Sequence, residues 1–168
     1  VTEIMEKASM AFLNGDVKKA DEAIALAEVN EERALAIDEM AIRILSRQSP
    51  VARDLRVLVS ALRISASLER MGALAGHIAT IARFRYPESA VPEGLVKTFS
   101  EMGALDCALA RKLTQLLRNT DVDLARSIQA EDERVDELHR SVFDLVLSEN
   151  WKENSIYTVD VTLASRYH

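Results

Sequence analysis

The 168-residue sequence is poor in the residues that form turns, disulfides and aromatic cores. It contains five Gly, three Pro and one Cys, and aromatic residues make up 5% of it. A single cysteine cannot form an internal disulfide, which favours a reducing compartment. β-Rich proteins need frequent turn residues and strands of aromatic or β-branched side chains. Because the chain is instead filled with Ala, Leu, Arg, Glu and Ile, which are mostly good helix formers, we predict an all-α protein.

The sequence also lacks a basic stripe and a long apolar run. Its formal net charge is −6, whereas nucleic-acid-binding domains usually carry clustered Lys and Arg, so we predict no nucleic-acid partner. No apolar run approaches the ~18 residues that a membrane span needs, and no leader segment is visible. We therefore expect a cytoplasmic protein that does not span a membrane. The ends at Val1 and His168 resemble cuts in a longer chain.

The few helix-breaking segments divide the chain into six predicted helices. The breakers are Asn14-Gly15-Asp16, Gln48-Ser49-Pro50, Tyr86 to Pro92, Asn119-Thr120-Asp121 and Asn150 to Asn154. They predict a short first helix and a second of about 30 residues, roughly 45 Å long. Pro50 is expected to begin the third helix and Ser155 to cap the sixth.

Two helices open with similar sequences, which indicates an internal repeat. One begins Asp16-Val17-Lys18-Lys19-Ala20 and the other Asp121-Val122-Asp123-Leu124-Ala125. A period of this length in a helical pattern is typical of a duplicated supersecondary unit. We predict two tandem antiparallel three-helix bundles, residues 1–86 and 87–168, with the last helix incomplete.

Small residues line the expected helix contacts. Alanine recurs every seven residues at positions 20, 27, 34 and 41, with Ala23, Ile37 and Ile44 between and Asn30 as the polar member. Gly72 and Gly76 favour close approach of a neighbouring helix. We also expect His77 to be a packing histidine, Cys107 an unreactive core residue and Trp151 to fold back on the bundle.

Carboxylates at helical spacing mark one candidate site. Asp132 and Asp136 lie one turn apart on the same helix face, and His139 follows at another same-face position. Iron and zinc accept mixed carboxylate and imidazole ligands, so a metal site is one interpretation. A solvated acidic face is the other. The adjacent Glu69 and Arg70, in an otherwise apolar helix, favour a structural ion pair over a ligand pair.

Three motifs are the segments from Gln48 to Arg56, from Leu68 to Gly72 and from Glu131 to His139. Together they resemble the PhoU family of bacterial phosphate-signalling regulators, most closely its actinobacterial members. The resemblance implies a cytoplasmic adaptor that links the phosphate ABC transporter to a phosphate-sensing histidine kinase and that meets the membrane only through these partners. It also implies negative regulation of the phosphate-starvation response and of phosphate uptake, without enzymatic activity. A homodimer with a second copy of the chain is a further expectation.

The resemblance implies metal binding in a restricted form. Family members hold iron or zinc through E/D-x-x-x-D motifs, but here Ala27 pairs with Glu31 and Ala73 with Glu69. Glu31 and Glu69 are therefore not expected to suffice. Any metal is expected at Asp132 and Asp136 with Glu131 nearby, completed by residues beyond His168, and no cofactor is required. The alternative function is a metal-carboxylate helical bundle that binds or stores iron or zinc.

Overall fold

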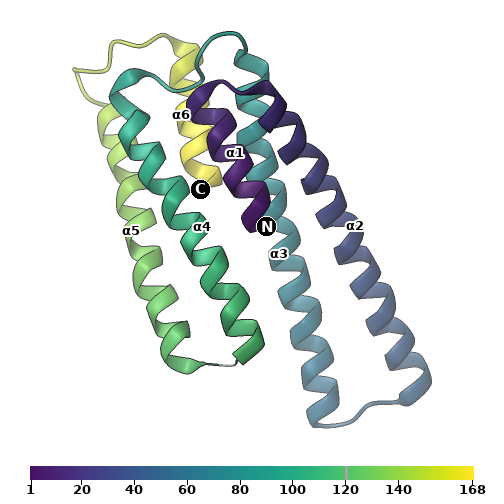
Figure 1. Ribbon diagram of the computed structural model, residues 1–168. Coiled ribbons are helices and arrows are strands. Elements are labelled where there is room, and N and C mark those ends of the chain that lie inside the picture. The colour runs from purple at the N-terminus through teal and green to yellow at the C-terminus, as the bar shows by residue number, and fades with distance from the viewer. Residues whose placement is uncertain (120) are drawn as a thin grey trace.

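The computed structural model describes residues 1–119 and 121–168, in which every regular element is a helix (Figure 1). This confirms the all-α prediction. The elements are α1 (Thr2–Asn14), α2 (Val17–Gln48), α3 (Arg53–Arg85), the 3-10 turn η1 (Glu93–Leu95), α4 (Val96–Asn119), α5 (Val122–Val146) and α6 (Ser155–Tyr167). None of the helices in the described residues is long and apolar enough to cross a membrane.

Local capping signals set most helix ends as predicted. Gly15 ends α1 with a left-handed φ of 65°, which glycine adopts without a Cβ penalty. The Asp16 side chain accepts a hydrogen bond from the backbone N–H of Lys19 at 3.0 Å. Asp121 caps α5 in the same way, so both predicted repeat openings are helix N-caps. At α6 the predicted cap is wrong by one residue, because Asn154 rather than Ser155 accepts from the backbone of Tyr157.

The turn between α2 and α3 differs from the prediction. Pro50 was expected to be the first residue of α3, but that helix begins at Arg53. Ser49 and Ala52 have positive φ angles of 42° and 48°. These left-handed conformations reverse the chain, so helical geometry resumes only after Ala52.

In the described residues, six α-helices form two antiparallel groups that pack against each other. In the first group α1 lies on both α2 and α3. In the second, α4 pairs with α5, and α6 packs on α5. Contacts also join the groups, because α1 packs on α4 and α3 packs on α6. Figure 1 shows the α2–α3 hairpin extending beyond the end of the α4–α5 hairpin.

The core lies where the two groups meet. The rings of Phe12 and Phe99 pack edge to face with centroids 5.1 Å apart, and both side chains are buried. Cys107 is buried as predicted. Trp151 packs against this core and donates from Nε1 to the Thr158 hydroxyl at 2.8 Å, which confirms that its loop folds back.

An ion pair ties α3 to α6 near this core. The Arg85 guanidinium holds the Asp160 carboxylate through two nitrogens, with Nη2 to Oδ1 at 3.0 Å. Asp160 is only 4% exposed, so the pair supplies the charge partner that a buried carboxylate requires.

The small-residue seam between α2 and α3 forms as predicted along part of its length. A Cβ added at Gly72 would lie 2.4 Å from Nδ2 of Asn30, and one at Gly76 would lie 3.0 Å from the Cβ of Ala27. Asn30 donates from Nδ2 to the carbonyl oxygen of Leu68 at 3.1 Å. Ile37 was predicted to lie on this stripe, but its side chain is exposed. In this part of the molecule α3 alone covers α2 (Figure 1).

Candidate functional site

The carboxylates of Asp132 and Asp136 open onto one cavity between α5 and α6. The cavity has a volume of about 190 Å³, and His139, Ser165 and His168 also line it. Both aspartates are exposed to solvent. The structure therefore places this predicted pair on one face together with His139, as their helical spacing requires.

Glu131 does not share this cavity. Its carboxylate accepts hydrogen bonds from Nζ of Lys112 on α4 and from the hydroxyl of Ser127, the latter at 3.2 Å. The hydrogen bond from Lys112 is the main cause that lowers the pKa of Glu131. Glu131 thus joins α5 to α4, on a different side of the helix from Asp132 and Asp136.

Two histidine contacts at this cavity were not predicted from the sequence. Nδ1 of His139 lies 2.7 Å from the hydroxyl and 2.9 Å from the carbonyl oxygen of Ser165. Nδ1 of His168 lies 2.6 Å from a carboxylate oxygen of Asp106. In each pair the two residues lie at least 26 positions apart in the sequence, so no local spacing predicts the contact.

Burial is the main influence on the pKa of Asp106. It raises the pKa of this carboxyl, and the nearby Asp132 adds to the rise, whereas the hydrogen bond with His168 opposes it. The low-dielectric surroundings of the carboxyl therefore favour its neutral form more than water does.

Ser165 and His139 do not form an accessible nucleophile and base. Although Ser165 lines the cavity, it is only 2% exposed, so little of its hydroxyl is open to a substrate from solvent. The contact instead ties α5 to α6 and fixes the orientation of the imidazole ring.

The described side chains around Asp132 and Asp136 do not complete a set of metal ligands. Among residues 1–119 and 121–168, no three His, Cys, Asp or Glu side chains are grouped closely enough to hold an ion. Two exposed carboxylates supply a few oxygen ligands, whereas tight binding needs more ligands in fixed positions. The donor set thus fits weak cation binding rather than a rigid cluster.

The first-repeat carboxylates also share a cavity. Glu31 of α2 and Glu69 of α3 line a space of about 190 Å³, and Ala27 and Ala73 line it too. The alanines thus stand where the resemblance places carboxylates. Glu28, which was not among the predicted site residues, lines the same cavity.

Two predictions for α3 are wrong. His77 was expected to be a packing histidine, but it is exposed at the same cavity, with its ring centroid 5.2 Å from that of Tyr167. Glu69 and Arg70 were expected to form an ion pair, yet no salt bridge of the described part of the chain includes either residue. Adjacent helical residues point in different directions, which accounts for the second error.

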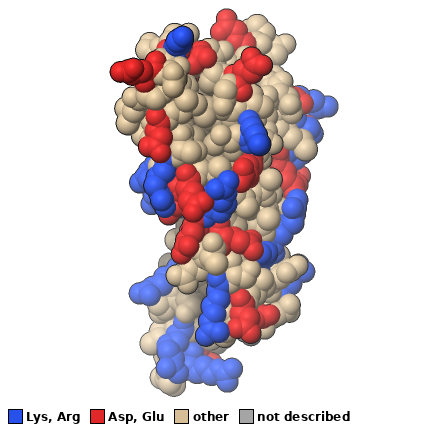
Figure 2. All heavy atoms as spheres, turned by 90° about the vertical axis from the view of Figure 1, so that its left-hand side faces the viewer, with Lys and Arg blue, Asp and Glu red and all other residues tan. Residues whose placement is uncertain are grey.

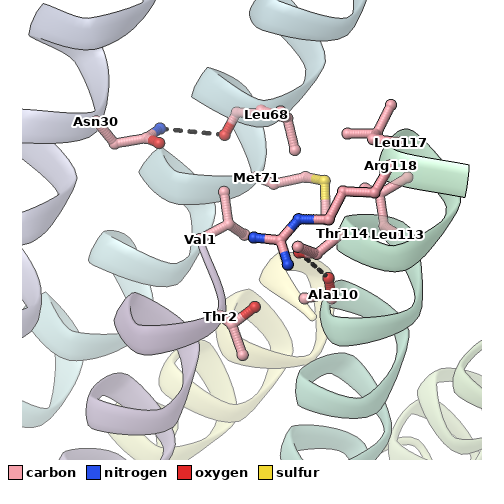
Figure 3. Close-up of a pocket in the computed structure, with 10 residues that line it drawn as sticks. All are labelled: Val1, Thr2, Asn30, Leu68, Met71, Ala110, Leu113, Thr114, Leu117 and Arg118. Atoms are coloured by element: carbon pink, nitrogen blue, oxygen red, sulfur yellow. Dashed lines mark hydrogen bonds between the residues drawn. The ribbon is translucent and has the colours of Figure 1, made fainter.

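A larger cavity lies between α3 and α4. It has a volume of about 320 Å³, and Figure 3 shows Leu68, Met71, Leu113 and Leu117 around it, with Arg118 extending across. Its walls come from both helix groups, so the periodicity of a single helix does not predict it. The lining is mainly aliphatic and offers a surface for packing rather than for bond-making chemistry.

Comparison with known proteins identifies the same family over almost the whole chain. The family model described as "PhoU domain" matches residues 1–82 and 99–167. One relative, the "Phosphate-specific transport system accessory protein PhoU homolog 2" of Mycobacterium tuberculosis, is 38% identical over 98% of this chain and 77% of its own length. The PhoU homolog 1 of the same species is 34% identical over 97% of this chain and 74% of its own length.

A solved structure agrees with the fold. The crystal structure of PhoU from Pseudomonas aeruginosa superposes with a TM-score of 0.89 at 23% identity. It covers 99% of this chain and 80% of that protein. The helical arrangement of the described residues is therefore shared with that protein. The family model and the mycobacterial relatives show that this chain belongs to the PhoU family.

Proposed function

We propose that this protein is a cytoplasmic accessory protein of a phosphate-specific transport system. In this role it represses the phosphate-starvation response and phosphate uptake by linking the transporter to a phosphate-sensing histidine kinase. The observation that supports this proposal most strongly is the 38% identity to a phosphate-specific transport system accessory protein over 98% of this chain.

The structure supports a binding role over a catalytic one. The Ser165 hydroxyl beside His139 is buried, and so is the Cys107 thiol. Burial raises the pKa of Cys107 to about 11, which disfavours the nucleophilic thiolate at neutral pH. Long helices instead expose an extended surface, so regulation by contact with partner proteins is the activity that we assign.

A deletion strain tests the regulatory role. The gene is deleted, together with any paralogue, and a starvation-induced reporter is measured in high phosphate. We expect the reporter to rise in the deletion strain and to fall again when the gene is restored. A reporter that stays fully repressed in the deletion strain contradicts the proposal.

A pull-down tests the partners. The tagged protein is recovered from phosphate-replete cells, and mass spectrometry identifies what accompanies it. We expect the phosphate transporter and the sensor kinase to be enriched over a pull-down with an unrelated helical protein of similar charge. Absence of both is the result that argues against the adaptor role.

The cavity at Asp132 and Asp136 supports a second, weaker candidate, which is the binding of iron or zinc. We propose that any bound metal uses these two carboxylates rather than Glu31 and Glu69. Metal content is measured by mass spectrometry in Asp132→Ala/Asp136→Ala and in the matched variant Glu31→Ala/Glu69→Ala. If only the Glu31→Ala/Glu69→Ala variant loses metal, the assignment of the metal to Asp132 and Asp136 is wrong.

A further inference from the structure

The far end of the α2–α3 hairpin has a charge opposite to that of the rest of the protein. Within residues 40–68 the charged side chains are Arg43, Arg47, Arg53, Arg56 and Arg63 against Asp54 alone, a net charge of +4. The whole chain has a net charge of −6, so the remaining residues carry −10. Figure 2 shows blue side chains gathered at the lower end of the molecule, where this hairpin projects. We call residues 40–68 the hairpin end.

The five arginines form no salt bridges within the described part of the protein. All five belong to exposed residues. In the described part of the chain, no acidic group lies within salt-bridge distance of any of them. By contrast, many basic residues elsewhere, among them Lys7, Arg85 and Arg134, have acidic partners. The hairpin end therefore presents unneutralised guanidinium groups to its surroundings.

Aliphatic side chains are exposed between these arginines. Val51, at the turn itself, is 75% exposed, Ile42 is 63% exposed, and Leu55 and Val59 are both 41% exposed. A mixed surface of arginine and aliphatic residues is typical of a protein interface, where arginine is enriched and lysine is depleted. The arginine fork also pairs with a carboxylate through two hydrogen bonds.

The composition of the hairpin end favours a protein partner over a lipid surface. Segments that bind membrane surfaces commonly combine lysine or arginine with tryptophan or phenylalanine. Residues 40–68 contain no lysine and no aromatic residue. Arginines alone, with aliphatic side chains, fit carboxylates held in fixed positions better than mobile headgroups.

We propose that the hairpin end is a docking surface for a carboxylate-rich surface of a partner protein. The identity of that partner rests on the proposed function, and the relatives' description as accessory proteins of a phosphate-specific transport system makes it the phosphate transporter. Guanidinium–carboxylate pairs would set the orientation of the complex and speed its formation, and Val51 and Leu55 would supply apolar contact.

Charge reversal tests the docking surface. The test variant is Arg47→Glu/Arg53→Glu/Arg56→Glu, and the matched control is Lys18→Glu/Lys97→Glu/Arg140→Glu, which changes the net charge equally at exposed residues elsewhere. Circular dichroism checks that both variants stay folded. Binding to the purified transporter in detergent and to the cytoplasmic part of the kinase is measured at two salt concentrations.

We expect the test variant to bind the transporter at least ~10-fold more weakly, with a smaller salt dependence, and the control to change by less than ~3-fold. Equal weakening of both variants overturns the docking surface but leaves the proposed function intact. Failure of the parent protein to bind either partner overturns both. Weaker binding to the kinase alone overturns the transporter as the occupant. Sedimentation with anionic vesicles and self-association are measured in parallel. If the test variant loses only one of these, the hairpin end meets a membrane or a second copy instead, and the proposal is overturned.

Discussion

Substitution of Gly72 by alanine tests how closely α2 and α3 approach. The added Cβ would lie 2.4 Å from Nδ2 of Asn30 and 3.3 Å from Cδ1 of Ile4. The Asn30 amide must then move away from the carbonyl of Leu68, to which it donates at 3.1 Å. The substitution therefore affects α1, α2 and α3 together.

Three terms give the expected size of the effect. Loss of the Asn30 hydrogen bond costs about 0.5–1.5 kcal/mol. Overpacking costs about 1–3 kcal/mol, and the better helix propensity of alanine returns about 1 kcal/mol. The net destabilisation is roughly 2 kcal/mol, which in a domain of this size lowers the Tm by about 4–8 °C.

Thermal and urea unfolding followed by circular dichroism measure this change. Gly94→Ala is the control, because no atom lies within 4 Å of a Cβ added there. In an Asn30→Ala background the clash is gone, so Gly72→Ala should cost much less. A Gly72→Ala protein as stable as the parent, or an equal cost in both backgrounds, would refute the reasoning.

Three further predictions concern buried or paired ionisable groups. Arg85→Met leaves the buried carboxylate of Asp160 without its partner and should cost about 3–5 kcal/mol in urea unfolding. Asp160→Asn should cost less, because the Arg85 side chain is 31% exposed and water can solvate it. With a pKa of about 11, only about 0.1% of Cys107 is thiolate at pH 8, so Ellman's reagent should label the folded protein far more slowly than the unfolded one. The pKa of Glu22 is lowered to about 2, chiefly by the hydrogen bond from Lys7. Since a depressed carboxyl pKa stabilises the fold above the unfolded value of 4.5, this contribution should fade as pH falls from there toward 2. In Lys7→Met an NMR titration should show the Glu22 pKa rising, and an unchanged pKa would contradict this cause.

Features that depend on local sequence were predictable. The glycine and aspartate at positions 15 and 16 mark one helix boundary, and Asp121 marks another, because caps act within a single turn. The common face of Asp132 and Asp136 follows from helical spacing in the same way.

Features that depend on which helix covers a face were not predictable. Periodicity shows that Ile37 and His77 share a face with alanines, but it does not show whether a neighbour reaches that face. The contacts of Asp106 with His168 and of Arg85 with Asp160 join residues 62 and 75 positions apart. Only the packing of the two helix groups brings these partners together.

The contact between Phe12 and Phe99 has a consequence for the connection between the two helix groups. Because α1 packs on α4 and α3 on α6, each group completes the core of the other. A protease cut within residues 86–95 should therefore leave two fragments that remain associated and melt in a single cooperative transition. Either fragment alone would expose the face that the other covers, so covalent continuity matters less to this protein than the complementarity of its halves.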